Sequence, residues 1–137
     1  MKKHKGQSVV EFALVLPLFL LIMFGIIYSG MMFHDYAALS NIARASAREA
    51  AVSDTRSDFT DIKSYYTPQL SYLLTSFYKP AGSDPISIVQ IHDNEKNRDI
   101  IKSTIIMQLS VDGFFVDMIF PKTFGVEYYM QKEPYTN

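Results

Sequence analysis

The sequence predicts an α+β protein in which a long N-terminal transmembrane and stalk helix is followed by a small domain with helices and an antiparallel sheet. Three observations predict this. Positions 12–33 carry no charged residue, and apolar residues then recur at helical spacing as far as about residue 77. From Ile86 onward the apolar residues alternate with polar ones, which is the period of a half-buried strand.

The first element is an apolar segment long enough to cross a bilayer. It runs from Phe12 to Phe33 and is apolar except at Pro17, Gly25, Ser29 and Gly30. As a helix it would be about 33 Å long, against about 30 Å for the hydrocarbon core of a membrane. The chain is therefore expected to be a single-pass membrane protein.

The flanks of this segment predict its orientation. Lys2, Lys3 and Lys5 precede it, whereas His34 and Asp35 follow it. Because positive charge is retained in the cytoplasm, the N-terminus is expected inside and the C-terminal domain outside.

A secretory signal peptide is the alternative interpretation, with an Ala-x-Ala match at Ala43–Ala45. The apolar segment is longer than the h-region of about 7–15 residues that such a signal has. The Ala-x-Ala match also lies well beyond the segment, within an expected helix, so ordinary signal cleavage is disfavoured.

The helix is expected to continue past the membrane as a stalk. Asp35 to Val52 contains no Gly or Pro and seven alanines. A helix from about Ser8 to Val52 would be about 65 Å long. On this stalk, Arg44 and Arg48 are expected to be solvated or to contact other subunits.

Two further helices are predicted at the start of the exported domain. The first has Ser57 as N-cap and an apolar stripe at Phe59, Ile62 and Tyr66. Thr67 and Pro68 have the composition of the N-cap and first position of the second helix. Its apolar stripe consists of Leu70, Leu73, Leu74 and Phe77.

Three strands are predicted after a loop at 79–85. They cover 86–91, 101–111 and 124–130, with a polar loop at 92–99 and turns at 112–113 and 121–122. The apolar segment 114–120 fits either a packed loop or a short helix. Strands in this order with short connections favour an antiparallel sheet.

Composition and motifs exclude several function classes. The chain has no cysteine, so disulfides, Cys-ligated metals and thiol catalysis are excluded, and 13 basic against 14 acidic residues give no case for nucleic acid. No catalytic or nucleotide-binding motif occurs, so we expect no enzyme, no cofactor and no metal. The acidic loop Asp93–Asp99 lacks the spacing and turn glycine of an EF-hand.

Four residues of the apolar helix invite a functional interpretation. Glu11 lies at the membrane boundary, either as an interfacial charge that reaches water or as a carboxylate whose cationic partner is supplied by an assembly. Pro17 removes a backbone hydrogen bond and is expected to kink or soften the helix. Gly25 and Ser29 form a small-xxx-small pair at which another helix could approach.

Taken together, residues 6–30 have the pattern of a prepilin signal. A basic leader precedes Gly6, Glu11 follows five residues later, and Phe12 opens the apolar block Phe-Ala-Leu-Val-Leu-Pro that ends at Pro17. This pattern resembles the TadE-like pseudopilins of the tight-adherence (Tad/Flp) type IV pilus system. The resemblance is strongest over residues 5–52.

The resemblance implies a division of the chain and a set of roles. Residues 1–6 would be a prepilin-type leader, 7–52 the transmembrane and stalk helix, and 53–137 the exported pilin-like domain. A prepilin peptidase would cut between Gly6 and Gln7, and Glu11 with Phe12 and Pro17 would serve assembly. The implied function is that of a minor pseudopilin in the assembly of an adhesive pilus.

The implied partners are the membrane, the peptidase, other pilin or pseudopilin subunits and the inner-membrane pilus platform. The protein would remain in the inner membrane or enter the extracellular pilus. The alternative function is a signal-anchored binding or sensor domain, for which the helix is only a tether.

Overall fold

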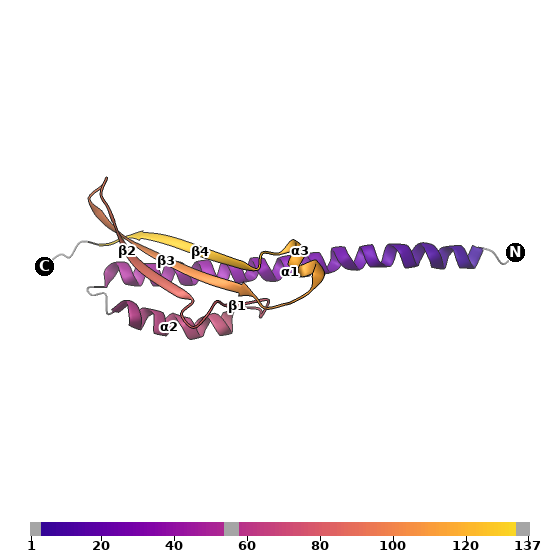
Figure 1. Cartoon of the computed structure of the whole chain (residues 1–137), viewed down its shortest axis with the longest axis horizontal. Coiled ribbons are helices and arrows are strands. Elements are labelled where there is room, and N and C mark those ends of the chain that lie inside the picture. Colours follow the sequence, from indigo (N-terminus) through magenta and orange to yellow (C-terminus); the bar gives the residue numbers. More distant parts are fainter. Residues whose placement is uncertain (1–3, 54–57, 134–137) are drawn as a thin grey trace.

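A computed structural model describes residues 4–53 and 58–133 of the chain (Figure 1). Helix α1 runs without interruption over His4–Val52. Its N-terminal half projects from the rest of the molecule, and the domain lies along its C-terminal half (Figure 1). The predicted membrane segment and stalk are therefore one helix, which starts a turn earlier than expected.

Helix α2 covers Asp58–Leu73 and contains Pro68 in its interior. The prediction that a new helix begins at Thr67–Pro68 was wrong. The Thr67 Oγ1 donates to the Lys63 carbonyl at 2.7 Å, which is a bond within a helix and not an N-cap. Burial of Ile62 and Leu70 on either side of Pro68 favours one continuous helix over two. The expected N-cap Ser57 lies outside the described residues.

The sheet is antiparallel, with β3 (Arg98–Leu109) at its centre. On one side β3 pairs with β2 (Ile86–Asp93) and, at its far end, with the short β1 (Tyr78–Pro80). On the other side it pairs with β4 (Thr123–Gln131), with Val126 opposite Ile105. The predicted antiparallel sheet is confirmed, and β1 is a strand within a segment that had been expected to be a loop.

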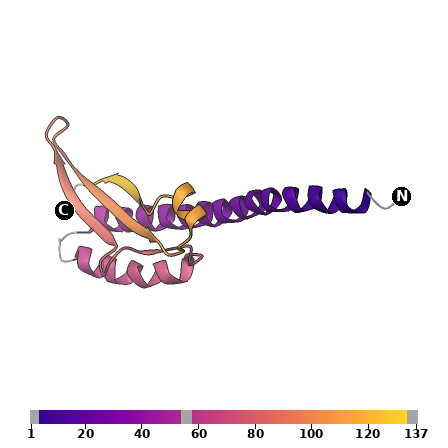
Figure 2. The ribbon, with the colours of Figure 1, turned by 45° about the vertical axis from the view of Figure 1, so that its right-hand side comes forward.

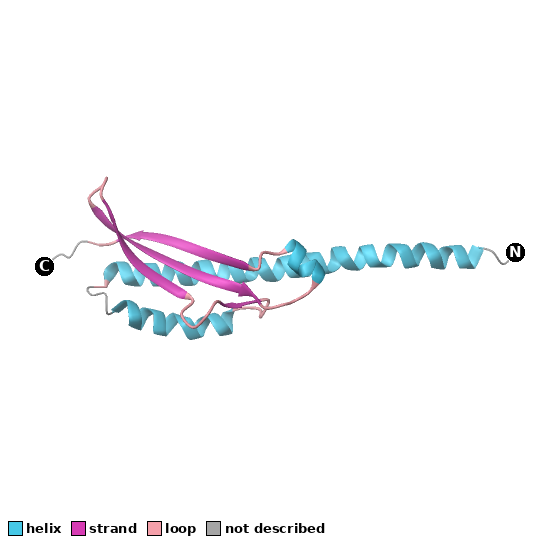
Figure 3. Cartoon of the chain, viewed as in Figure 1, coloured by secondary structure: helices cyan, strands magenta, loops and turns pink. Residues whose placement is uncertain are grey.

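One face of this sheet packs on α1 and α2, so the domain has two layers (Figures 2 and 3). Alternate residues of β3, Ile101, Ser103, Ile105 and Met107, are fully buried. α1 presents mostly alanines to this face, together with Leu39 and Ile42. Small side chains allow the helix and the sheet to approach closely.

A polar contact lies inside this interface. The Ser46 and Ser103 hydroxyls, both fully buried, are 2.8 Å apart. The Ser46 Oγ also donates to the Ala43 carbonyl at 3.2 Å. The pair satisfies two hydroxyl groups that would otherwise be buried at a cost.

The segment after β3 forms a short helix, α3, over Phe114–Ile119. The sequence left a packed loop and a short helix as alternatives for this segment, and the structure shows the helix. It lies at the end of the domain nearest the projecting half of α1 (Figure 1). Val116 and the following Phe120 are buried in the core beneath it.

Candidate processing and assembly site

The first described turns of α1 expose the predicted cleavage position. Gly6 and Gln7 are both exposed. A Cβ built on Gly6 would meet no atom within 4 Å outside its own neighbours and helix backbone. The residues on both sides of the predicted cut thus lie on the exposed surface of α1.

Glu11 lies one helical turn beyond Gln7. The Gln7 Nε2 donates to the Glu11 Oε1 at 3.3 Å, a long and exposed hydrogen bond. The next acidic residue along α1 is Asp35, about 36 Å away along the helix axis. Glu11 is therefore an exposed carboxylate at the edge of a long uncharged surface.

The surface that follows is apolar on all sides. Phe12 and the other large side chains up to Phe33 are predominantly exposed, and no residue of the most apolar stretch is fully buried by the domain. By length and composition α1 can cross a membrane once. An exposed apolar helix of this length is compatible with a single-pass membrane protein.

The residues of the apolar segment for which a role in bending or helix packing was predicted lie in this projecting part. They are Pro17, Gly25 and Ser29. α1 continues unbroken through Pro17, so the expected softening of the helix stays a prediction. Gly25 has open space where a Cβ would be, and Ser29 is exposed. The room for a second helix at this pair is present, and a partner there stays a prediction.

The junction between α1 and the domain rests on a residue that the sequence analysis treated only as a flank. Asp35 is fully buried, and its two carboxylate oxygens accept from the Thr75 N–H at 2.8 Å and the Thr75 Oγ1 at 2.9 Å. The His34 Nδ1 lies 3.5 Å from the same carboxylate. These bonds fix the segment after α2 to the end of the apolar surface.

Aromatic rings complete this junction. Tyr28 of α1 stacks on Phe77 with centroids 5.3 Å apart and meets the edge of Phe120 at 6.4 Å. The Tyr78 hydroxyl donates to the Pro121 carbonyl at 3.0 Å. Burial, and then the negative charge of Asp35, raise the pKa of Tyr78 above its ordinary value. The available signal in the sequence was an acidic residue just after an apolar run, with Tyr28 two turns earlier on the same face of the helix.

The stalk residues behave largely as expected. Arg44 and Arg48 are exposed, and the Arg44 guanidinium lies over the Tyr128 ring at 5.4 Å from its centroid. Arg44 thus helps cover the edge of the sheet, and Arg48 remains available to solvent or another subunit.

Glu49, on the same stalk, contacts Tyr66 of α2. Burial, together with a hydrogen bond to Glu49, raises the pKa of Tyr66.

The acidic residues of the β2–β3 hairpin are engaged in local bonds. The Asp93 carboxylate accepts from the backbone N–H groups of Glu95 and Lys96, and Asp99 accepts from His92 at 2.7 Å and Gln90 at 2.8 Å. The hydrogen bond from His92 is the main reason that the pKa of Asp99 is lowered. Within the described parts of the chain, no three His, Asp or Glu side chains are grouped to hold a metal ion.

Comparison with known proteins finds similarity in α1. The family model described as TadE-like protein matches residues 6–48. The resemblance to TadE-like proteins of Tad pilus systems is thereby confirmed over these residues. No curated protein and no solved structure matches the chain. The matched range holds Gly6, Glu11 and Pro17 and extends to the part of α1 beneath the sheet.

Proposed function

We propose that this protein is a minor pseudopilin of a Tad-type pilus, cut between Gly6 and Gln7 and assembled through its N-terminal helix. The observation that carries the proposal is the coincidence of the family match with the exposed part of α1. The exposed cleavage position, the isolated carboxylate of Glu11 and the uncharged surface all lie within it.

The charge distribution supports an orientation with the N-terminus in the cytoplasm. Three lysines precede Gly6, and the buried Asp35 lies at the opposite end of the uncharged segment. In this orientation the Gly6–Gln7 bond faces the cytoplasm, where a prepilin peptidase would cut it. The domain then stands on the outer face of the inner membrane.

Cleavage would create a new cation close to Glu11. Removal of residues 1–6 leaves a free amine on Gln7, one turn from Glu11. Within one chain the helix directs both groups along the same face, and in an assembly the amine of one subunit can meet the carboxylate of its neighbour. Two opposite charges withdrawn from water are far more stable paired than apart.

The partners in this proposal are sibling pilin or pseudopilin subunits, the inner-membrane pilus platform and the peptidase. The protein's part in adhesion is indirect, through the pilus that it helps to assemble. Its role is structural and involves no catalysis. In the alternative, a tethered binding or sensor domain, neither cleavage nor Glu11 matters.

Intact mass measured with and without a prepilin peptidase tests the proposal. With the peptidase the chain should shorten to 131 residues, Gln7 to Asn137. Gly6→Leu should stay uncut, because a large side chain replaces the open space at the cleavage position. Gly30→Leu, at a second α1 glycine with no atom within 4 Å of its Cβ position, is the matched control and should be cut normally.

A chain that keeps residues 1–6 in the presence of the peptidase would contradict the proposal. So would cleavage that Gly6→Leu leaves unchanged, since it would place the cut elsewhere. Either result would favour the tethered-domain alternative.

A further inference from the structure

The short helix α3 is apolar on two opposite sides. Val116 and, just beyond the helix, Phe120 point into the core and are each 8% exposed. On the opposite side Met118 is 68% exposed, and Phe114, one turn before it, is also exposed. Ile119, on the side that lines the space toward α1, is 53% exposed. An exposed apolar face that adjoins a further apolar surface is typical of a site that contacts a membrane or another protein.

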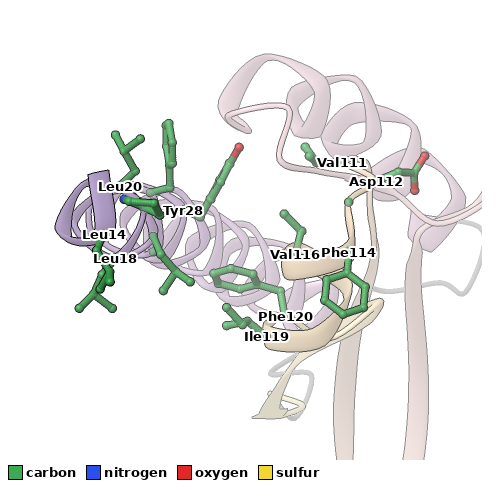
Figure 4. Close-up of a pocket in the computed structure, with 15 residues that line it drawn as sticks. Leu14, Leu18, Leu20, Tyr28, Val111, Asp112, Phe114, Val116, Ile119 and Phe120 are labelled. Carbon is green, nitrogen blue, oxygen red and sulfur yellow. The ribbon is translucent and has the colours of Figure 1, made fainter. Parts of the chain in front are cut away.

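α3 also stands next to the helix that crosses the membrane. Together with the preceding Val111–Gly113 segment it forms one wall of an apolar groove of about 820 Å³ (Figure 4). α1 forms the other wall, from Leu14 through Leu18 to Tyr28. The groove therefore opens onto the same uncharged surface that would face acyl chains.

The position of α3 along α1 defines its depth. Its C-terminal end lies level with Tyr28, which meets the Phe120 ring at 6.4 Å. Tyr28 is about 8 Å inside the outer end of the uncharged segment at Phe33, counted along the helix axis. Helices that lie in a membrane interface bury their apolar face about 5–10 Å into the boundary between headgroups and acyl chains.

We propose that α3 is a membrane-interface anchor, whose exposed side chains Met118 and Ile119 insert into the outer leaflet beside α1. The occupant of the groove is then lipid acyl chain. The argument is continuity: the apolar face of α3 extends the lipid-facing surface of α1 at the depth where an interfacial helix is stable. The inference rests on the membrane insertion of α1 that the proposed function includes.

The charges around α3 indicate which force drives the insertion. Asp112 and Asp117 are exposed, and Lys122 follows the helix. This mixture gives no excess positive charge to attract anionic lipid. Apolar burial alone should therefore hold α3 in place, and vesicles of phosphatidylcholine should serve as well as vesicles that contain phosphatidylglycerol.

Because the chain has no cysteine, single spin labels can be placed without other changes. The full-length variants Met118→Cys, Ile22→Cys and Tyr72→Cys are labelled in phosphatidylcholine vesicles. Collision with oxygen, which concentrates in lipid, is compared with collision with a water-soluble nickel chelate. Ile22 lies in the apolar segment and is the lipid reference, whereas Tyr72 on α2 is 87% exposed and is the water reference.

The ratio of oxygen to nickel collisions at position 118 should be several-fold higher than at position 72 and should approach that at position 22. A ratio at position 118 equal to that at position 72 would overturn the inference. Loss of both collision rates at position 118, relieved by diluting the protein in lipid, would overturn it as well and would assign the face to a second copy.

The reference position separates this inference from the proposed function. If position 22 reports lipid and position 118 reports water, only the anchor is wrong. If position 22 also reports water, α1 is not inserted, and both the anchor and the membrane location in the proposed function fail.

Discussion

Among single residues, Asp35 connects the exposed apolar part of α1 to the domain. It lies two residues beyond the uncharged segment and is completely buried, and Thr75 donates to each of its two carboxylate oxygens, at 2.8 and 2.9 Å. Burial of a carboxylate is tolerated only where hydrogen bonds replace the lost water. Asp35 therefore fixes the height of the domain above the apolar segment.

Replacement of Asp35 by Ala should destabilise the full chain by about 1–3 kcal/mol, because the part-buried Thr75 N–H loses its acceptor. Asp35→Asn should cost less, since the amide oxygen can still accept that bond. Urea unfolding in a mild detergent would measure both variants. Equal losses in the two variants would contradict the hydrogen-bonding role and assign the effect to the charge.

Glu127, also a single residue, makes a pH-dependent contribution to the stability of the folded chain. The Lys102 ammonium, 2.7 Å from its carboxylate, is the main cause of a lowered pKa for Glu127, and the Tyr129 hydroxyl at 2.9 Å adds to it. When folding lowers the pKa of a carboxylate, that carboxylate stabilises the folded chain. Its full contribution is present above the pKa of the unfolded chain, about 4.3. The contribution is lost as the pH falls through the lowered value.

Glu127→Gln should therefore be slightly less stable than the unaltered chain at neutral pH and should converge with it in acid. The exposed pair makes the effect small. Thermal unfolding in steps of pH measures it, with Glu95→Gln at the exposed hairpin turn as a control for loss of one negative charge. A difference that grows as the pH falls would contradict this account.

At the scale of elements, α2 shows how packing overrides local composition. A proline in a helix interior is about 3 kcal/mol less favourable than alanine, yet α2 passes through the exposed Pro68. Burial of Phe59, Ile62 and Leu70 along one face of α2 offsets this cost.

Pro68→Ala should consequently leave the chain as stable or raise its stability by about 1 kcal/mol, since the regained helix bond is partly offset by a more flexible unfolded chain. Ser71→Ala, at an exposed position of the same helix, is the matched control for the helix propensity of alanine. Thermal unfolding compares the two. A clear loss of stability in Pro68→Ala alone would mean that the ring itself packs against the domain.

The elements that the sequence predicted are those whose pattern is local. Alternation over 101–111 predicted a strand, which the structure shows as β3 over Arg98–Leu109, and the fully buried residues of β3 are odd-numbered ones of that pattern. β1 was missed because Lys79 and Pro80 have the composition of a loop, and the strand exists only through pairing with the far end of β3. The junction at Asp35 was missed for the same reason, because Thr75 is 40 residues away.

At the scale of the whole molecule, the two halves of α1 have different environments. Its first half is exposed and apolar, and its second half contributes Leu39, Ile42 and several alanines to the core of the domain. The domain and the stalk therefore share one core and hold together without any disulfide. A force applied to the N-terminal half of α1 would be transmitted directly to the sheet.

Removal of residues 1–6 would change the charge of this assembly unit. Three lysines leave with the leader, so the side chains of the mature chain would carry ten basic against fourteen acidic residues. Glu11 is the acid among them that lies at the edge of the uncharged surface. Its pairing with a new N-terminal amine is the central claim for assembly.

A double-mutant cycle on Gly6 and Glu11 tests that claim most directly, with co-purification of sibling pseudopilin subunits as the measured quantity. Glu11→Gln alone and Gly6→Leu alone should each reduce co-purification, because each removes one partner of the same charge pair. The double variant should be no worse than either single variant. Effects that multiply in the double variant, or normal co-purification of Glu11→Gln, would contradict the account.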